Sequence, residues 1–350
     1  MSDSQLSPVR PTQPVDFVPL SPDLVEKSIP ALFELNAAKR PDSVAVTSRG
    51  VALTYRELDR RSNALANRIV AEAGEGKEPV AILCGHTSQA IVSILGTLKS
   101  GRPYIGLDAS FPLERMKQIV SDSGTRYVLT DEANLETGRD LAQAGVALMN
   151  IEAADLGLAE GGPGIFAKPT DLAVIFYTSG STGNPKGVVW KHETFVSNSI
   201  HQVNQVYTSP SDRCLLINSI AYASSRTSVY DTLLSGGTVC MYDIKAKGAA
   251  AMADFLLSER VTILRCPTPV LRTIFGPLPD GFIFPDMRLG LMGGQAPTAQ
   301  DVMLYRRHTP PDSVFGNHFA STEVGIISNY LLNRETPMDW DILPVASLVL

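Results

Sequence analysis

The fold is decided by the stretch Tyr177-Thr178-Ser179-Gly180-Ser181-Thr182-Gly183-Asn184-Pro185-Lys186-Gly187. The apolar run just before it, residues 172–176, predicts a buried strand. Glycines let backbone N–H groups approach an anion closely, while the hydroxyls and Lys186 add donors and a positive charge. The stretch therefore predicts a strand that leads into a polyphosphate-binding loop.

Two other interpretations apply to stretches of this kind. A P-loop requires Gly-Lys-Ser/Thr at the start of a helix, whereas Lys186 lies between Pro185 and Gly187. The remaining alternative is a solvated Ser/Thr/Gly turn between two strands, because residues 188–190 also favour a strand.

Composition limits the class of protein. The chain has 350 residues, of which 44% are hydrophobic, so it can bury a large core and form two or three lobes. Its formal net charge is -6, and it has no basic run of the kind that grips a phosphate backbone. Nucleic acid is therefore not an expected partner.

The cysteines and the termini give few signals of their own. The four cysteines are far apart, form no C-x-x-C pair and lie among aliphatic or small residues, which predicts reduced, buried thiols rather than disulfides or a zinc site. Residues 1–20 are proline-rich and polar, which predicts a flexible lead rather than a signal peptide. No apolar run approaches the ~20 residues of a membrane helix. The expected location is cytoplasmic, without a membrane partner.

Strand and helix patterns alternate along the chain, which predicts an α/β fold with mostly parallel sheets. Apolar spacing predicts helices from Ile29 to about Arg40, from Tyr55 onward, and over residues 88–99 and 195–206. Strands are predicted at residues 80–84, 127–130, 146–149, 215–218 and 261–267, and a hairpin at 44–47 and 51–54. The turn-rich residues 161–164 predict a joint between lobes of about 21–165 and 166–350.

The stretch at 177–187 closely resembles the phosphate loop of the adenylate-forming (AMP-binding) enzymes, the superfamily of acyl-CoA synthetases, luciferases and nonribosomal peptide synthetase adenylation domains. Residues 53–58 and 98–108 resemble two early structural signatures of the peptide synthetase adenylation domains. The resemblance implies that residues 21–350 form the large N-terminal domain of this fold, with two α/β lobes. It also allows part of a small β-barrel near the C-terminal end.

The same resemblance implies a site for ATP and Mg²⁺. Residues 317–323 resemble the Asn-x-Tyr-Gly-Pro-Thr-Glu motif, with Ala320 and Ser321 in place of glycine and proline. Lys186, Thr322 and Glu323 would act in catalysis, and Glu323 would also hold Mg²⁺. The nucleotide would contact residues of the loop, the glycine-rich turn and this motif: Thr178, Ser179, Gly180, Ser181, Thr182, Gly183, Lys186, Gly294, Gln295, Asn317, His318, Phe319 and Thr322. As an alternative, Thr322-Glu323 could start a helix.

A substrate pocket is implied by residues 219–237, which match the family's Phe-Asp-x-Ser motif without gaps. Ala223 stands where amino-acid-activating members have the aspartate that holds the α-ammonium. Since a buried ammonium without a counter-charge is disfavoured, the expected substrate is an acid without a free α-amino group, or an amino acid held in an unusual way. The pocket positions are Tyr222, Ala223, Ser224, Thr227, Arg265, Leu291, Gly293, His318, Ile326 and Ile327.

Two polar residues have open roles. Arg265 lies in an otherwise apolar strand, where it could pair with a second acidic or carbonyl group of the substrate or extend to water. His192 could touch substrate or cap the helix that follows it.

The implied reaction is attack of a carboxylate on the α-phosphorus of Mg·ATP, followed by transfer of the acyl group to a carrier-protein phosphopantetheine thiol. An acyl-CoA ligase is the subclass alternative. The family's ribose-binding aspartate and its C-terminal domain with a catalytic lysine have no counterpart before Leu350. An ATP- or acyl-binding fragment without turnover, or a domain completed in trans, is therefore the second expectation.

Overall fold

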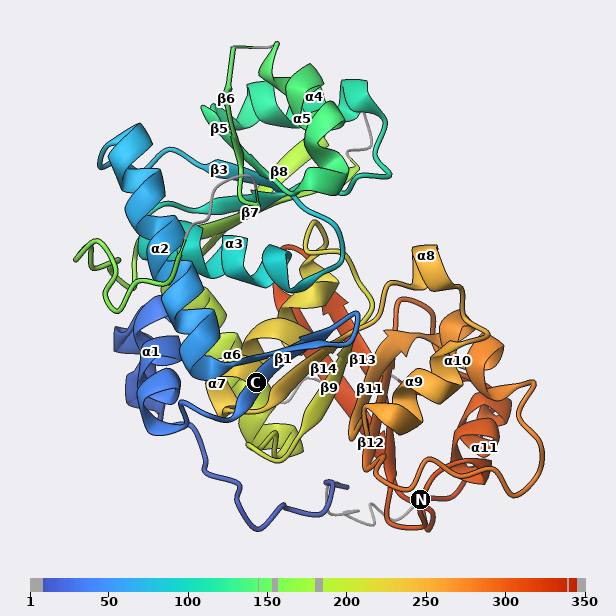
Figure 1. Cartoon of the computed structure of the whole chain (residues 1–350). Helices are drawn as coiled ribbons and strands as arrows, with labels where there is room; N and C mark the ends of the chain where they lie inside the picture. Colours follow the sequence, from blue (N-terminus) through green and yellow to red (C-terminus); the bar gives the residue numbers. More distant parts are fainter. Residues whose placement is uncertain (1–8, 144, 153–156, 180–184, 339, 345–350) are drawn as a thin grey trace.

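The computed structural model describes residues 9–143, 145–152, 157–179, 185–338 and 340–344 (Figure 1). Within these ranges the strands form two sheets, one of six strands and one of eight. Helices lie against both sheets, so the predicted α/β architecture is confirmed. No helix in the described part of the chain is long and apolar enough to cross a membrane.

The six-stranded sheet has the order β6-β5-β3-β4-β7-β8. Its strands are β3 (Val80–Leu83), β4 (Tyr104–Gly106), β5 (Tyr127–Thr130), β6 (Ala147–Asn150), β7 (Leu172–Ser179) and β8 (Pro185–Lys191). All neighbours are parallel except β7 and β8, which form an antiparallel pair. The strand predicted before the phosphate loop is therefore confirmed, and its partner strand follows the loop.

The eight-stranded sheet has the order β14-β13-β12-β11-β9-β10-β1-β2. Its strands are β1 (Val44–Ser48), β2 (Val51–Thr54), β9 (Arg213–Leu216), β10 (Thr238–Met241), β11 (Ile263–Pro267), β12 (Leu289–Gly293), β13 (Val314–Ser321) and β14 (Gly325–Leu332). Antiparallel pairing occurs at both edges, in the predicted β1–β2 hairpin and between β13 and β14. Every strand of the described ranges belongs to one of the two sheets, so the small β-barrel is not found there.

Helices of the first half are α1 (Ile29–Lys39), α2 (Tyr55–Ala73), α3 (Ser88–Lys99), α4 (Leu113–Ser123) and α5 (Leu135–Ala142). Those of the second half are α6 (His192–Val206), α7 (Thr232–Ser235), α8 (Ile244–Lys247), α9 (Met252–Ser258), α10 (Thr268–Phe275) and α11 (Ala299–Arg307). Short 3₁₀ turns, η1 (Pro22–Glu26), η2 (Glu132–Asn134) and η3 (Ala223–Ser225), and one π turn, η4 (Thr227–Asp231), complete the described structure.

Local sequence explains where α2 begins and ends. Thr54 and Glu57 form a capping box, in which the Thr54 hydroxyl accepts a hydrogen bond from the Glu57 N–H and the Glu57 carboxylate accepts one from the Thr54 N–H. Gly74 follows the helix with a φ of 69°, a conformation that favours glycine. The sequence signature at residues 53–58 is thus a helix start, as a scaffold role requires.

Helix α3 is the element that joins the two sheets. It is buried from Ala90 to Lys99 and packs against β3 and β4 of one sheet and β1 of the other, with α2 alongside (Figure 1). Because every residue from Ala90 to Lys99 is buried, this mostly apolar helix is covered on all sides there. The largest hydrophobic cluster therefore runs continuously from the six-stranded sheet to the eight-stranded one.

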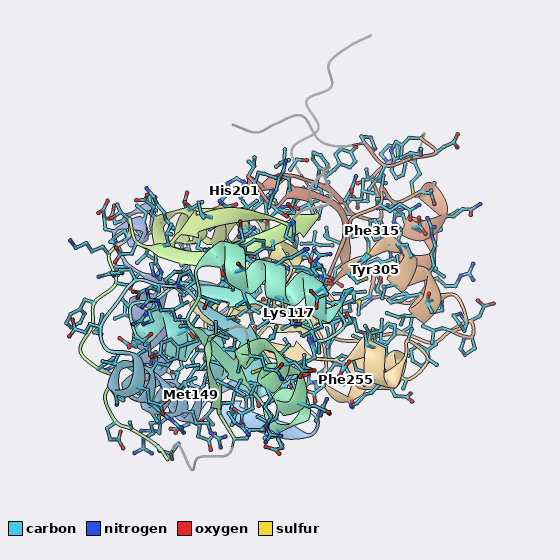
Figure 2. All side chains as sticks on the ribbon, turned by 90° about the horizontal axis from the view of Figure 1, so that it is seen from above. Lys117, Met149, His201, Phe255, Tyr305 and Phe315 are labelled. Atoms are coloured by element: carbon cyan, nitrogen blue, oxygen red, sulfur yellow. The ribbon has the colours of Figure 1, made fainter. Side chains whose placement is uncertain are left out.

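The eight-stranded sheet is covered on both faces because its parallel strands are apolar at successive positions. In β10, Val239 and Met241 join the cluster around α3, whereas Cys240 points to the opposite face and joins the cluster under α9, α10 and α11. On that opposite face Tyr305 of α11 contacts Phe315 of β13 at a ring distance of 5.2 Å (Figure 2). The sheet is thereby held as a rigid support for the loops at its strand ends.

Each sheet draws strands from both sides of the predicted lobe boundary at residues 165–166. β1 and β2 belong to the eight-stranded sheet, while β7 and β8 complete the six-stranded one. The division between sheets therefore does not coincide with that boundary. Residues 9–20 form neither helix nor strand, yet Leu20 exchanges two hydrogen bonds with the side chain of Asn204 on α6.

Candidate functional site

A cavity of about 560 Å³ lies where the carboxyl ends of strands from both sheets meet. Parallel α/β sheets bind their ligands at this edge, because the loops that follow the strands are free to carry functional groups. The described lining comes from the ends of β7, β11, β12 and β13, the start of β14, helix α4, and the segment after β9 that includes η3 and the start of η4. The cavity therefore assembles the segments that the sequence singled out.

Eleven of the predicted site residues line this cavity. They come from the phosphate loop strand, the substrate motif, the glycine-rich turn and the last motif: Thr178, Tyr222, Ala223, Ser224, Thr227, Arg265, Leu291, Gly293, Gly294, His318 and Thr322. The remaining predicted residues are not among the described residues that line it: Lys186, Gln295, Asn317, Phe319, Glu323, Ile326 and Ile327. Gly180, Ser181, Thr182, Gly183 and the side chain of Ser179 lie outside the described part of the chain.

The described site residues that do not line the cavity lie on the elements that form it, on the turns next to them, or on the paired strand β8. Lys186 is exposed on β8, in register with Thr178 on β7. Phe319 is 46% exposed near the end of β13, and Glu323 is exposed in the turn between β13 and β14. That turn excludes the alternative in which Thr322-Glu323 starts a helix. Asn317 is buried, and its amide donates a hydrogen bond to the Pro344 carbonyl at 3.4 Å.

The last motif is held in place by the aromatic core. The indole Nε1 of Trp190 on β8 donates a hydrogen bond of 2.8 Å to the Thr322 carbonyl. Trp190 is buried and packs edge-on against Phe195 of α6. This contact ties the strand that follows the phosphate loop to the segment with Thr322, so the two predicted phosphate-contacting segments are connected directly.

His192 has a structural role. It begins α6 and is buried, and its Nδ1 accepts a hydrogen bond from the Ile29 N–H at 3.3 Å, at the first turn of α1. It is not among the described residues that line the cavity. The predicted cap of the helix that follows His192 is therefore wrong: α6 has no side-chain cap, and His192 binds the start of α1 instead.

Arg265 does not extend to water. Its residue exposure is 7%, and its Nη1 donates a hydrogen bond of 3.1 Å to the carboxylate of Asp231, which is fully buried in η4. Nε and Nη2 of Arg265 are buried and have no partner in the described structure. The alternative of an arginine that reaches solvent is therefore wrong, and two donor nitrogens of this cavity-lining side chain have no partner among the described residues.

A second buried arginine, Arg226, was not predicted. It connects η3 to η4, is 3% exposed and lines the cavity, with its guanidinium carbon 5.1 Å from the centre of the Trp190 ring. Burial lowers the pKa of this guanidinium, and Nη1 has no partner among the described residues. Its position between Ser224 and Thr227, both already assigned to the pocket, was the available signal.

His318 is a neutral group in the cavity wall. Burial lowers its pKa to about 4, and the nearby charges of Arg265 and Arg226 act in the same direction. Its Nδ1 lies 2.6 Å from the side-chain oxygen of Asn329. The side-chain nitrogen of Asn329 in turn donates hydrogen bonds to the side-chain oxygens of Gln202 and Gln205. In this network Nδ1 carries the proton, so Nε2 is an acceptor.

The charged groups of the cavity are all of one sign. Its described lining includes Arg115, Arg226 and Arg265 but no aspartate or glutamate. Asp231 is the carboxyl group that lies behind the lining; burial raises its pKa, while the charges of Arg265 and Arg226 lower it. The protein as a whole has a formal net charge of -6, so the positive charge of this cavity is a local feature that would attract anionic ligands.

A second, smaller cavity of about 360 Å³ lies at the ends of β3 and β4 and the start of α8. It contains Cys84, His86, Asp108 and Lys245, and the Lys245 ammonium contacts both Asp108 oxygens at 2.9 Å. None of the predicted site residues is among the described residues that line it.

Comparison with known proteins gives consistent results. The chain is 29% identical over 310 residues to tyrocidine synthase 3 of Brevibacillus parabrevis, an alignment that covers 88% of this chain and 5% of that protein. It therefore spans only a small part of that relative. Among solved structures, the NpsA N-terminal subdomain of Klebsiella oxytoca in complex with 3-hydroxybenzoyl-AMSN aligns with a TM-score of 0.78 and 20% identity, over 92% of this chain and 80% of that one.

A second solved structure has the same fold. NpsA-ThdA of Klebsiella oxytoca, an artificially fused adenylation-PCP di-domain, aligns with a TM-score of 0.74 and 21% identity, over 88% of this chain and 60% of that one. These likenesses establish the fold of an adenylation N-terminal subdomain. The model of the family described as AMP-binding enzyme matches residues 33–347. The chain, with its strand-end cavity and its phosphate-loop strand pair, belongs to the AMP-binding enzyme family.

Proposed function

We propose that this chain binds Mg·ATP and a carboxylic acid and activates the acid as an acyl-adenylate. The observation that carries the proposal is the assembly of one cavity from segments far apart in sequence, which include Thr178, Ala223, Gly293 and Thr322. Membership of the AMP-binding enzyme family supports the use of ATP. The acid would lie in the cavity, and the nucleotide would lie across its rim.

The chemistry needs positioning more than proton transfer. A carboxylate is already ionised near neutral pH and can attack the α-phosphorus directly, with pyrophosphate as the leaving group. A new bond forms between the carboxylate oxygen and the α-phosphorus. At the same time the bond breaks between the α-phosphorus and the oxygen that bridges it to the β-phosphorus. Thr322 would donate to the α-phosphate, Lys186 would face the terminal phosphates, and the backbone of Gly293 and Gly294 would lie along the acyl group and adenine.

The donor set is compatible with Mg²⁺. Among the described residues there is no cluster of three or more metal-binding side chains, so an all-protein cage for a metal is not found there. Mg²⁺ usually keeps several waters and binds one or two carboxylates together with substrate phosphates. Exposed Glu323 in the turn after β13 would supply such a carboxylate. Bound there, the ion would neutralise phosphate charge.

The acyl acceptor is proposed to be the phosphopantetheine thiol of a carrier protein. One relative is a tyrocidine synthase by name, and one structure with this fold is an artificially fused adenylation-PCP di-domain. Coenzyme A offers the same thiol chemistry and is the alternative acceptor. Transfer of labelled acyl groups to each thiol by the enzyme in its full-length form distinguishes them.

The proposal is tested by nucleotide binding. Lys186→Ala removes a charge that would face the β- and γ-phosphates, and a charge-assisted hydrogen bond contributes about 1.5–3 kcal/mol. The affinity for Mg·ATP, measured by calorimetry, is expected to fall roughly tenfold or more. Lys191→Ala is the matched control, because Lys191 ends the same strand and pairs with Glu193 on the surface.

The control variant is expected to bind Mg·ATP like the unmodified chain. Equal affinities for the unmodified chain and Lys186→Ala would remove the predicted role of the phosphate loop. No detectable binding of Mg·ATP to the unmodified chain would contradict the proposed function as a whole.

A further inference from the structure

The cavity contains buried positive charge that the described residues do not neutralise. Arg226 and Arg265 are 3% and 7% exposed, and both line the cavity. Asp231 is the carboxyl group that pairs with Arg265, and Arg226 forms no ion pair among the described residues. Two guanidiniums against one carboxylate leave one net positive charge. Burying such a charge is unfavourable unless a partner compensates it.

Free hydrogen-bond donors accompany this charge. Nε and Nη2 of Arg265 and Nη1 of Arg226 are fully buried and have no partner among the described residues. The face of the Trp190 indole lies 5.1 Å from the Arg226 guanidinium carbon and supports it from one side. Buried donors in folded proteins are almost always satisfied, by protein, water or ligand. Both side chains line the cavity and have donors without a described partner, so they are candidates to bind acceptor oxygens of a ligand.

The other polar groups nearby do not supply a negative charge. His318 is neutral, and burial raises the pKa values of Tyr104 and Tyr230, so these phenols stay protonated. Burial also keeps the Cys214 thiol protonated, because it raises the pKa of that group. Within the described part of the chain no further group balances the two arginines, so a ligand that carries a negative charge would supply the partner.

The arginine pair is separated from the place of reaction. In the ladder between β11 and β12, Pro267 is opposite Gly293 at the strand ends, while Arg265 is opposite Leu291, two residues earlier. At about 3.3 Å per residue, the backbone of Arg265 lies about 7 Å below the rim where the glycine-rich turn begins. An acid whose reacting carboxylate is at the rim would direct its far end toward the arginines.

We infer that the acid activated here carries a second anionic group, remote from the reacting carboxylate, which Arg226 and Arg265 bind. This inference rests on the proposed function and names its substrate class, the dicarboxylic and comparable dianionic acids. The planar guanidinium suits a carboxylate because it can donate two parallel hydrogen bonds. Asp231 then has the role of orienting Arg265 rather than of neutralising it completely.

The test uses stable mimics of the acyl-adenylate. Acylsulfamoyl adenosines made from straight-chain dicarboxylic acids of about four to seven carbons are compared by calorimetry with the corresponding ω-amides, which have the same size and no charge at the far end. The ω-carboxylate is expected to bind at least about tenfold tighter than the ω-amide at the best chain length, as charge-assisted hydrogen bonds imply.

Two variants locate the effect. Arg226→Gln removes one guanidinium, and the double variant Arg265→Gln with Asp231→Asn removes the ion pair without leaving a lone buried charge. Each is expected to reduce the preference for the ω-carboxylate at least about fivefold while affinity for the ω-amide stays within about twofold. Lys117→Gln is the control, because Lys117 lies on α4 beside the cavity, pairs with Glu114 on the surface and is not among the described residues that line the cavity.

The control is expected to retain the preference for the ω-carboxylate, and thermal melting of each variant reports whether it is folded. Should one arginine variant fail to fold, the other decides the matter. Equal or tighter binding of the ω-amides at all chain lengths would overturn the inference and leave the proposed function intact. Absence of binding by every mimic and by Mg·ATP would instead overturn the proposed function, and the inference with it.

Discussion

At the scale of single residues, the proposed function gives Ala223 the role of excluding acids that carry an α-ammonium. It lines the cavity at the position where an aspartate would hold an α-ammonium, and no described residue of the lining has a carboxylate. An α-ammonium would therefore find no acidic partner among the described residues of the lining. The cost of burying it unpaired is large compared with the affinity of a small ligand.

The lack of a carboxylate in the described lining predicts which acyl groups bind more tightly. Acylsulfamoyl adenosines whose acyl group lacks an α-amino group are expected to bind more tightly than their aminoacyl counterparts, by roughly tenfold or more, since one unpaired charge is avoided. Calorimetry with matched pairs, such as propionyl against alanyl and phenylpropionyl against phenylalanyl, measures the difference. A consistent preference for the aminoacyl compounds would show that another group binds the ammonium.

His192 makes stability depend on pH. Burial lowers its pKa to about 4, with Asp171 acting in the opposite direction and Lys77 in the same one. In the unfolded chain its pKa is about 6.5, so between about pH 6.5 and 4 the unfolded state binds more protons than the folded state. Stability contributed by the neutral His192 is therefore present above about pH 6.5 and is lost as the pH falls toward 4.

The variant His192→Asn tests this linkage. The asparagine side chain would offer an oxygen to the Ile29 N–H and would not titrate, so the variant is expected to lose less stability than the unmodified chain between about pH 7 and pH 4.5. The difference amounts to a few kcal/mol at most, on the basis of about 1.4 kcal/mol per pKa unit. Urea denaturation at both pH values measures it, and parallel losses would contradict the assignment.

The two buried arginines of the cavity differ in how well the sequence predicted them. Arg265 was recognised because a charge in an apolar strand is unusual, but the sequence left open whether it reached solvent or ligand. Arg226 was missed, since a charge beside two serines gives no periodic signal of burial. Its burial depends on Trp190 and Asp231, which approach it only in the folded chain.

At the scale of elements, the end of β4 contacts the loop that leads to Tyr222 and Ala223 of the cavity. Gly106 lies directly against residues 220–221, and a Cβ added there would be 2.6 Å from the Ile220 carbonyl oxygen and 2.7 Å from the Ala221 Cα. These neighbours are backbone atoms, so they yield only if the loop moves. Tyr222 and Ala223 of the cavity follow directly along this loop.

Gly106→Ala is expected to displace that loop. The predicted result is a loss of about 1–3 kcal/mol in unfolding free energy, as for overpacked cores, together with weaker binding of acyl-adenylate mimics. Gly161→Ala is the matched control, because a Cβ at Gly161 would meet nothing within 4 Å and the residue has no positive φ. Chemical denaturation and calorimetry measure both effects; a fully stable Gly106→Ala variant with unchanged affinity would contradict the predicted contact.

Helices and strands were well predicted where the sequence pattern that specifies them lies within the element or next to it. The buried strands β3, β5 and β7 and the helices α1, α2 and α3 follow from apolar runs, periodicity and caps near each end. The sheet to which each strand belongs did not follow, because pairing depends on residues far apart in sequence. Val46 of β1, for example, is in register with Val239 of β10.

At the scale of the whole molecule, the two sheets act as one support for the cavity. α3 fills the space between them, and the cavity takes residues from the ends of strands in both. Tyr177 of β7 and Cys266 of β11 thus line the same space although they belong to different sheets. The phosphate-loop stretch and the substrate motif each follow a strand that the sequence predicts, whereas residues 317–321 of the last motif lie within β13 itself.

The central claim is that this cavity holds the acyl group of an acyl-adenylate. A crystal structure of the chain with a bound acylsulfamoyl adenosine tests it most directly. The account predicts adenosine at the rim near Gly294 and Thr322, with the acyl chain between Ala223 and Leu291 and its far end directed at Arg226 and Arg265. Ligand bound instead in the smaller cavity beside His86 and Asp108, or an acyl group that avoids the arginine-lined space, would contradict it.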